Sequence, residues 1–249
     1  MMADSRILAV DIGNTNIVLS VHDGTEWGEA LRVKSKSHDS IEEFTSKLQP
    51  LTYEKAVVSS VVPYLTDPVI DAVRKHSGIN PVVVCNDIET GLNKETIPAE
   101  LGADILCNLI AAHRLYPDDY VTVADFGTAF TTETVSPQGD VLGVTIGPGM
   151  MTSVKALFAN AAQIPEIRLD LPNTVLGRDT VSSIRAGVIY GFVGQLKSIV
   201  EQVEKEVGHK VVVIATGGFS RYLEGKIYVN KADVKHTLEG ARLACLLNS

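Results

Sequence analysis

The feature that most constrains the fold is a pattern that occurs twice, about half a chain length apart. An apolar run at residues 7–10 ends in Asp11-Ile-Gly-Asn-Thr15, and a second run at residues 120–124 ends in Asp125-Phe-Gly-Thr128. A second strand pattern, a turn signal and a third candidate strand follow each of them, which is typical of β-hairpins. The repeat predicts two related halves rather than a solenoid, and the alternative is two unrelated hairpins.

Helical and strand patterns alternate in the rest of the chain. The hydrophobic spacing predicts helices at residues 40–49, 64–76, 181–203 and 234–247, the third of them as one helix or two. Short buried strands are predicted at residues 55–62, 81–85 and 210–215. This alternation predicts the α/β class. We expect halves at residues 1–115 and 116–249, joined by a helix near residues 100–115.

The Asp-x-Gly loops have the residues of a phosphate site. A glycine at a strand end permits a turn with a positive φ angle, where backbone amides approach an anion closely. Asn14 and Thr15 add side-chain donors, and a carboxylate such as Asp11 can hold Mg²⁺ through waters. Thr216-Gly-Gly218 supplies a third glycine turn at a strand end. The chain has neither a Walker-type nor a Rossmann-type glycine motif.

Composition and charge exclude several classes of function. The formal net charge is −8 and the chain has no lysine and arginine cluster, so nucleic-acid binding has no electrostatic basis. The three cysteines are far apart, which disfavours a disulfide framework or a metal site. The apolar run near the start is too short for a signal peptide or a membrane span, so we expect a cytoplasmic protein without a membrane partner.

The chain resembles the type III pantothenate kinases, members of the acetate and sugar kinase/Hsp70/actin superfamily. The resemblance runs from Asp11 to about Gly240. Its motifs, in chain order, are Asp11-Ile-Gly-Asn-Thr-Asn16, Gly102-Ala-Asp104, Asp125-Phe-Gly-Thr-Ala129, Gly143 with Ile146-Gly-Pro-Gly149, Gly177-Arg-Asp-Thr180, Gly187 with Tyr190-Gly191, and Thr216-Gly-Gly218. It implies two actin-like, ribonuclease H-like α/β halves with a duplicated β-hairpin phosphate-binding motif and a cleft between them.

The resemblance also implies a reaction and its residues. The reaction is ATP-dependent phosphorylation of pantothenate to 4'-phosphopantothenate, which opens coenzyme A biosynthesis. Asp104 would be the catalytic base, Asp11 would place Mg²⁺ through the phosphates, and Asp125 would bind K⁺ or NH₄⁺. ATP would contact Asp11, Ile12, Gly13, Asn14, Thr15, Asn16, Ile17, Val18 and Thr128. Pantothenate would contact Gly102, Ala103, Asp104, Ile105 and Thr180.

Thr180 would reach the pantothenate bound by the partner subunit, so the resemblance implies a homodimer. A candidate dimer face is the helix around residues 188–200, whose glycines allow close approach; the alternative is a buried core helix. From the residues alone, Asp104 would more often be a helix N-terminal aspartate favoured by the helix dipole. That alternative stays open at this point.

Two departures from the family pattern matter for the acceptor substrate, and a third is milder. Ile105 stands where the family has an arginine, residues 92–97 lack the family's tyrosine, and Val144 replaces the second glycine of a Gly-Gly pair. Loss of a cation facing a substrate carboxylate removes roughly 1.5–3 kcal/mol of binding free energy. Two alternatives therefore remain: a divergent kinase of another small hydroxyl compound, or a non-catalytic nucleotide-binding regulator.

Overall fold

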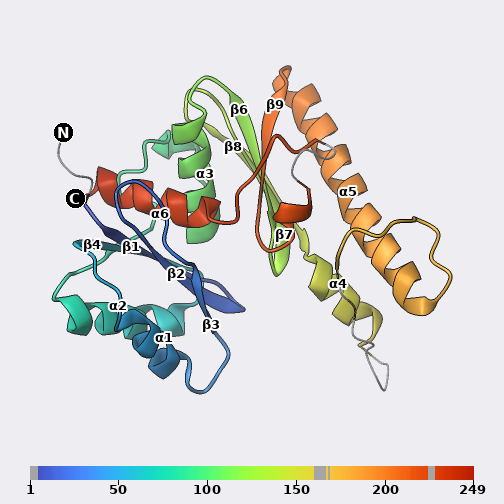
Figure 1. Cartoon of the computed structure of the whole chain (residues 1–249). Coiled ribbons are helices and arrows are strands. Elements are labelled where there is room, and N and C mark those ends of the chain that lie inside the picture. The colour runs from blue at the N-terminus through green and yellow to red at the C-terminus, as the bar shows by residue number, and fades with distance from the viewer. Residues whose placement is uncertain (1–4, 160–166, 168, 224–227) are drawn as a thin grey trace. The chain divides into compact units, whose positions relative to one another are not determined.

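The computed structural model describes residues 5–159, 167, 169–223 and 228–249, and Figure 1 shows the chain. It forms two compact units, each built on a five-stranded sheet. Unit 1 comprises residues 1–115, 138–141 and 236–249, and unit 2 comprises residues 116–137 and 142–235. The last helix therefore groups with the first half of the chain. The boundary predicted between residues 115 and 116 stays a prediction.

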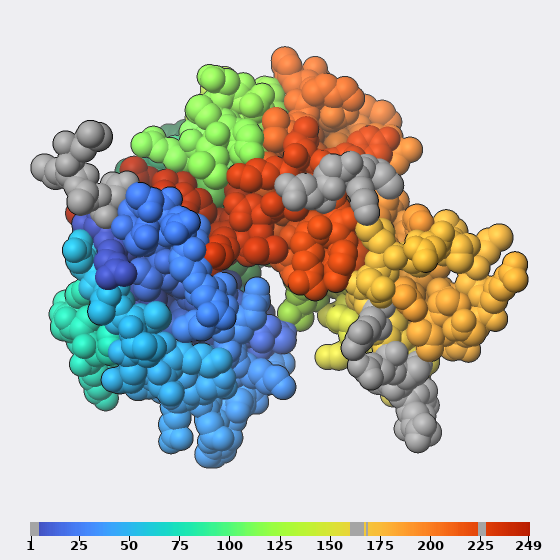
Figure 2. Space-filling model, in the orientation of Figure 1, coloured from blue at the N-terminus to red at the C-terminus, as the bar shows by residue number. Residues whose placement is uncertain are grey.

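The sheet of unit 1 has the strand order β3-β2-β1-β4-β5. Its strands are β1 (Ile7–Ile12), β2 (Asn16–His22), β3 (Leu31–Lys34), β4 (Lys55–Ser60) and β5 (Val82–Val83). β1 pairs antiparallel with β2 and parallel with β4, so the carboxyl ends of β1 and β4 meet at one edge of the sheet. The residues from β1 to α2, blue to cyan, pack as one body in Figure 2.

Helices cover both faces of this sheet. They are α1 (Ser40–Leu48), α2 (Pro63–Ser77), α3 (Ala103–Leu115) and α6 (His236–Leu247), with the short 3₁₀ helix η1 (Lys94–Thr96). Leu8, Val10 and Ile12 of β1 alternate toward the core that includes Phe44 of α1 and Val69 of α2. The intervening residues face α6, which contacts β1 and β4 and packs along α3.

Unit 2 repeats this plan. Its sheet has the order β10-β9-β6-β7-β8, with β6 antiparallel to β7 and parallel to β9. The strands are β6 (Tyr120–Phe126), β7 (Ala129–Val135), β8 (Val141–Pro148), β9 (Val211–Thr216) and β10 (Lys231–Ala232). The helices are α4 (Met150–Leu157), α5 (Thr180–Val207) and the 3₁₀ helix η2 (Ser220–Tyr222). Read from its hairpin edge, this sheet has the same strand order as that of unit 1.

The predicted α/β class and duplicated hairpins are therefore confirmed. The open choice at residues 181–203 resolves to one continuous helix, α5. Asp179 caps its N-terminus in a reciprocal capping box with Ser182, and Gly208 ends it in a left-handed conformation with φ 73°. No helix among the described residues is long and apolar enough to cross a membrane.

One local prediction was wrong. We expected positive φ angles at the glycines of both Asp-x-Gly loops, but Gly13 and Gly127 do not have them, whereas Gly217 does, with φ 83°. The first two glycines are needed for space instead. A Cβ at Gly13 would lie 3.3 Å from the Asn16 carbonyl oxygen, and one at Gly127 would lie 3.3 Å from Asp125 Oδ1.

Candidate functional site

The loop between β1 and β2 is a tight turn, stabilised by a hydrogen bond within it and by one from Ser35. The Gly13 amide donates to the Asn16 carbonyl oxygen at 3.0 Å, and the Ser35 hydroxyl donates to the Gly13 carbonyl oxygen at 2.6 Å. Asn14 and Thr15 are exposed at its tip. The side chains of Ile12 and Ile17 are fully buried, so these two residues can contact phosphate only through their main chain.

Unit 1 brings the carboxylates Asp11 and Asp104 to the same place. Asp11 is at the carboxyl end of β1, and Asp104 is in the first turn of α3. The buried thiol of Cys107, one turn further along α3, lies close enough to both carboxylates that each raises its pKa, although burial is the larger cause. The structure therefore brings two carboxylates that lie far apart in the sequence near one buried thiol.

The surroundings of Asp104 suit a proton acceptor. Its Oδ1 accepts a hydrogen bond from the Ile105 amide at 2.8 Å, and burial raises the pKa of the carboxyl. Gly102 makes room for it, because a Cβ there would lie 2.7 Å from Oδ1. The side chains of Ala103 and Ile105 are buried, so neither presents much surface to a substrate. Asp104 thus combines a position in the first turn of a helix with a partly buried carboxyl whose pKa is raised.

A cavity of about 980 Å³ opens beside Gly102 and Ala103 in unit 1. It lies at the carboxyl ends of β4 and β5, where open α/β sheets commonly bind ligands. The lining residues are Ser60, Val61, Pro63, Thr66, Val84, Cys85, Asn86, Asp87, Ile97, Ala99, Leu101, Gly102 and Ala103. This lining includes one carboxylate, Asp87, and no lysine or arginine.

In unit 2, Asp125 occupies the place that Asp11 occupies in unit 1. It pairs with Thr216 in the parallel ladder of β6 and β9. A Cβ at Gly217 would lie 2.5 Å from Asp125 Oδ1 and 2.7 Å from the Phe126 carbonyl oxygen, so both oxygens lie close to one point. Carboxylate and carbonyl oxygens are the ligands that hard cations prefer.

Gly149, between β8 and α4, packs against the loop that carries Gly127 and Thr128. Its amide donates to the Thr128 carbonyl oxygen at 3.0 Å, and the Thr152 hydroxyl donates to the same oxygen at 2.7 Å. A Cβ at Gly149 would clash with the main chain of Gly127 and Thr128. Thr128 itself is exposed. The second glycine of Gly147-Pro-Gly149 thus fixes the shape of the loop that carries Thr128.

Thr180 lies at the exposed start of α5, behind the capping residue Asp179. Gly177 packs directly against the main chain of Ser183 in the first turn of this helix. Further along α5, Val188, Phe192 and Val200 belong to the core of unit 2. The glycines at positions 187, 191 and 194 are exposed, and a Cβ at any of them would meet nothing within 4 Å.

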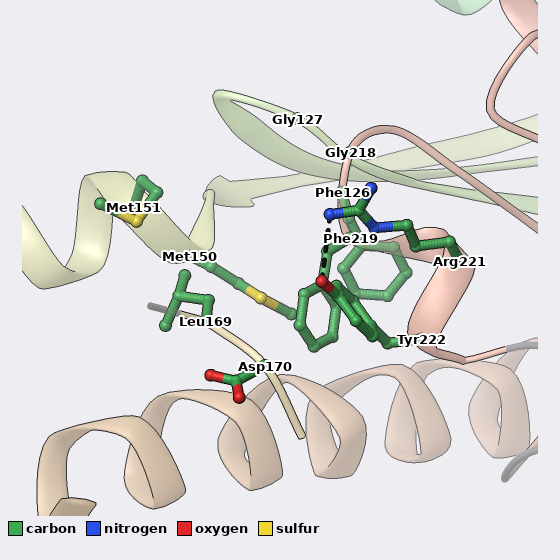
Figure 3. Close-up of a pocket in the computed structure, with 10 residues that line it drawn as sticks. All are labelled: Phe126, Gly127, Met150, Met151, Leu169, Asp170, Gly218, Phe219, Arg221 and Tyr222. Carbon is green, nitrogen blue, oxygen red and sulfur yellow. Dashed lines mark hydrogen bonds between the residues drawn. The ribbon is translucent and has the colours of Figure 1, made fainter. Parts of the chain in front are cut away.

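A second cavity, of about 620 Å³, lies in unit 2 beside the glycine loops and is shown in Figure 3. Gly127 and Gly218 form one edge, and aromatic rings with Met150 form a wall. The Phe219 ring centroid lies 5.3 Å from that of Tyr222. The remaining lining residues are Phe126, Met151, Leu169, Asp170 and Arg221.

Polar groups border this aromatic wall. The Arg221 guanidinium lies 4.9 Å from the Tyr222 ring centroid and donates to its hydroxyl at 3.0 Å, the bond dashed in Figure 3. Asp170 is on the side next to α5 and accepts a hydrogen bond from Arg185 at 3.0 Å. Sequence reasoning missed these residues, since nothing in the sequence links residues 170, 219 and 222. Residues 219–222 do directly follow the Thr216-Gly-Gly218 turn, which was the available signal.

Comparisons with known proteins fit this arrangement. Residues 7–202 match the family described as "Type III pantothenate kinase". A type III pantothenate kinase from Moorella thermoacetica is 36% identical over 95% of this chain and 97% of its own length. One from Syntrophus aciditrophicus is 34% identical over 98% of this chain and 100% of its own.

Solved structures support the fold. A conserved putative Baf family transcriptional activator from Campylobacter jejuni has a TM-score of 0.58 at 20% identity, covering 95% of this chain and 96% of its own. The ethanolamine utilization protein EutJ from Carboxydothermus hydrogenoformans has a TM-score of 0.50 at 17% identity, covering 97% of this chain and 89% of its own. The two sheets and these neighbours define the two-part α/β actin-like class that the sequence predicted.

The chain belongs to the type III pantothenate kinase family. It is therefore a kinase, which confirms the predicted reaction class.

Proposed function

We propose that this protein phosphorylates pantothenate with ATP as the donor, the first step of coenzyme A biosynthesis, in the cytoplasm. The observation that carries the assignment within the structure is the cluster of Asp11 and Asp104 around Cys107 in a chain of this family. A phosphoryl transfer enzyme needs charge neutralisation at the phosphates and an acceptor for the hydroxyl proton. One carboxylate of the cluster is suited to each task.

In this proposal Asp104 accepts the proton of the attacking hydroxyl. Its raised pKa keeps it basic enough for proton transfer, because an efficient general base has a pKa close to the working pH. The acceptor enters through the cavity beside Gly102, which also borders Val61 and Leu101. The predicted contact at Thr180 would come from the partner subunit of a homodimer.

The phosphates of ATP are assigned to the loop at residues 11–18 of unit 1 and to the loop carrying Thr128 of unit 2. The nucleoside is assigned to the aromatic cavity of unit 2, where Tyr222 offers a stacking surface and Asp170 an acceptor for ribose hydroxyls. Magnesium neutralises charge on the phosphates when it is bound, and Asp11 is the residue assigned to orient it. Asp125 with the Phe126 carbonyl oxygen is assigned to K⁺ or NH₄⁺.

The homodimer is part of the proposal. The glycine face of α5 supports it, because three exposed glycines on one side of a helix allow close approach of a second helix. The two alternatives predicted for this helix, a dimer face and a core helix, therefore concern different sides of it. Its apolar side lies in the core of unit 2, and its glycine side is open.

The direct test incubates purified protein with ATP, Mg²⁺, K⁺ and pantothenate and follows 4'-phosphopantothenate by mass spectrometry. We expect turnover that requires all four. Measurable nucleotide binding without any phosphopantothenate would contradict the assignment of the acceptor.

A second acceptor class is favoured by one observation. Among the described residues, the cavity beside Gly102 and Ala103 is lined by the carboxylate of Asp87 and by no basic side chain, and Ile105 is buried. A small primary alcohol without a carboxylate would suit that lining, because it needs no basic side chain to pair with. Comparing kcat/KM for pantothenate with that for its neutral amide and alcohol analogues decides between the two classes.

A further inference from the structure

Ser59 lies directly opposite Asp11 in the parallel ladder of β1 and β4. Its side chain is completely buried, with 0% of its surface exposed. The hydroxyl donates to Asp11 Oδ1 at 3.1 Å. Because residues that are paired in register on adjacent strands point to the same face, this contact follows from the strand pairing.

The thiol of Cys107 lies near the Ser59 hydroxyl. A hydroxyl has a single proton, and in this structure Ser59 donates it to Asp11. Cys107 is itself fully buried. Both side chains are thus buried near Asp11, and the serine hydroxyl is the group that donates to its carboxylate.

The helix that carries Cys107 is held firmly against the rest of unit 1. Gly240 of α6 packs directly on the main chain of Cys107, where a side chain would clash. The Thr237 hydroxyl donates to Asn108 Oδ1 at 2.8 Å one residue further along α3. A buried donor whose surroundings are fixed in this way holds its acceptor in one orientation.

We propose that Ser59 is a positioning residue for the phosphate-binding reaction: its hydroxyl fixes one oxygen of Asp11 so that the carboxylate faces the metal-bearing phosphates. A carboxylate end group otherwise rotates easily, because its terminal torsion is broad. The inference deepens the proposed function, since it rests on the nucleotide assignment. It does not depend on which acceptor is phosphorylated.

The test measures binding of a fluorescent N-methylanthraniloyl ADP without any acceptor, once in excess Mg²⁺ and once in EDTA. Loss of one hydrogen bond to a charged group corresponds to about a tenfold change in an equilibrium constant. We therefore expect Ser59→Ala to weaken binding about tenfold in Mg²⁺ and to leave binding in EDTA within twofold of the wild type. Ser59→Cys, which has a weak donor, should show the same split.

Two further variants separate positioning from packing. Ser59→Thr keeps the hydroxyl and should restore most of the Mg²⁺-dependent affinity. Ser20→Ala removes a buried hydroxyl elsewhere in the same sheet, one that donates to the Gly28 carbonyl oxygen at 3.0 Å, so its affinity should stay within twofold of the wild type. Urea unfolding followed by the fluorescence of Trp27, the only tryptophan, confirms that each variant is folded.

The proposal is overturned if Ser59→Ala and Ser59→Cys bind the nucleotide as the wild type does. It is also overturned if they lose the same affinity in Mg²⁺ and in EDTA, which would mark a packing role. If the wild type binds no nucleotide, the proposed function fails along with it. If it binds nucleotide but does not phosphorylate pantothenate, only the acceptor assignment fails and the test of Ser59 stands.

Discussion

Each unit places an aspartate at the corresponding point of its own sheet, but the residues around the two aspartates differ. Asp11 and Asp125 both end the first strand of a hairpin, beside a parallel strand whose paired residue is Ser59 in unit 1 and Thr216 in unit 2. In unit 1 a buried hydroxyl holds the carboxylate. In unit 2 the carboxylate lies against Gly217, in a left-handed turn with φ 83°.

The difference arises in the residues that follow the parallel strand. After β4 the chain passes through Val61 and Val62 into a helix that begins with Pro63, and the cavity beside Gly102 opens there. After β9 it turns through two glycines into an aromatic segment, and the second cavity opens beside Tyr222. Under the proposed assignment, one duplicated scaffold would support two chemistries, proton transfer in unit 1 and nucleoside binding in unit 2.

The largest effect is expected at Asp104. Asp104→Asn removes the general base, and such groups contribute about 10²–10⁴-fold to rate, so kcat for pantothenate phosphorylation should fall by that factor. Asp71→Asn, the same change at an exposed aspartate on α2, is the matched control and should leave kcat within twofold. Substantial remaining turnover in Asp104→Asn would remove Asp104 from the role of base.

Gly217→Ala should produce the next largest effect. Its Cβ would lie 2.5 Å from Asp125 Oδ1, in a backbone conformation that side chains rarely adopt. We expect a loss of about 1–3 kcal/mol in the free energy of unfolding and a weaker response of activity to K⁺. Gly218→Ala is the control, because a Cβ there meets nothing within 4 Å. Equal stability of the two variants in urea would refute this account of Gly217.

The pH dependence of unit 1 should follow Asp104. Burial raises its pKa above the ordinary value of 3.8, so kcat/KM should fall on acidification through a pKa higher than that value. The same shift favours the protonated folded state, so its stabilising contribution is complete below pH 3.8 and is lost as the pH rises through the folded pKa. Asp104→Asn should therefore be more stable than the wild type at pH 7. A less stable variant would contradict the burial assigned to this carboxyl.

The thiols give the smallest and simplest comparison. Cys85 is exposed, whereas Cys107 and Cys245 are buried and burial raises the pKa of both. Iodoacetamide should label the folded protein once, and Cys85→Ser should remove that label. All three cysteines belong to unit 1, so labelling of the other two in denaturant reports the opening of that unit alone. Rapid labelling of Cys107 in the folded protein would contradict its burial in unit 1.

The sequence predicted the duplicated hairpins because their signals are local. In each half, the apolar runs and the Asp-x-Gly turn lie within about fifteen residues of one another. The pattern that predicted the helix carrying Asp104 is equally local. The error about Gly13 and Gly127 had a physical reason as well. Glycine was needed there for close approach, and a sequence does not distinguish that need from a positive φ angle.

The parts that could not be predicted depend on contacts between distant residues. Ser59 appears in the sequence as one serine in an apolar strand, and only the register with β1 places it opposite Asp11. Gly240 reaches Cys107 only after α6 has folded back onto α3. The cavity in unit 2 likewise brings together Asp170 and Tyr222, which the long helix α5 separates in the sequence.

The division of work between the units is tested most directly by nucleotide binding in two variants, measured without acceptor. Stacking of a base on an aromatic ring contributes about 1–3 kcal/mol, so Tyr222→Ala should weaken N-methylanthraniloyl ADP about tenfold. Asp104→Asn should bind it within about twofold of the wild type while losing turnover. Unchanged affinity in Tyr222→Ala, or a loss in Asp104→Asn as large as the one expected for Tyr222→Ala, would contradict the assignment of the nucleoside to unit 2 and of the base to unit 1.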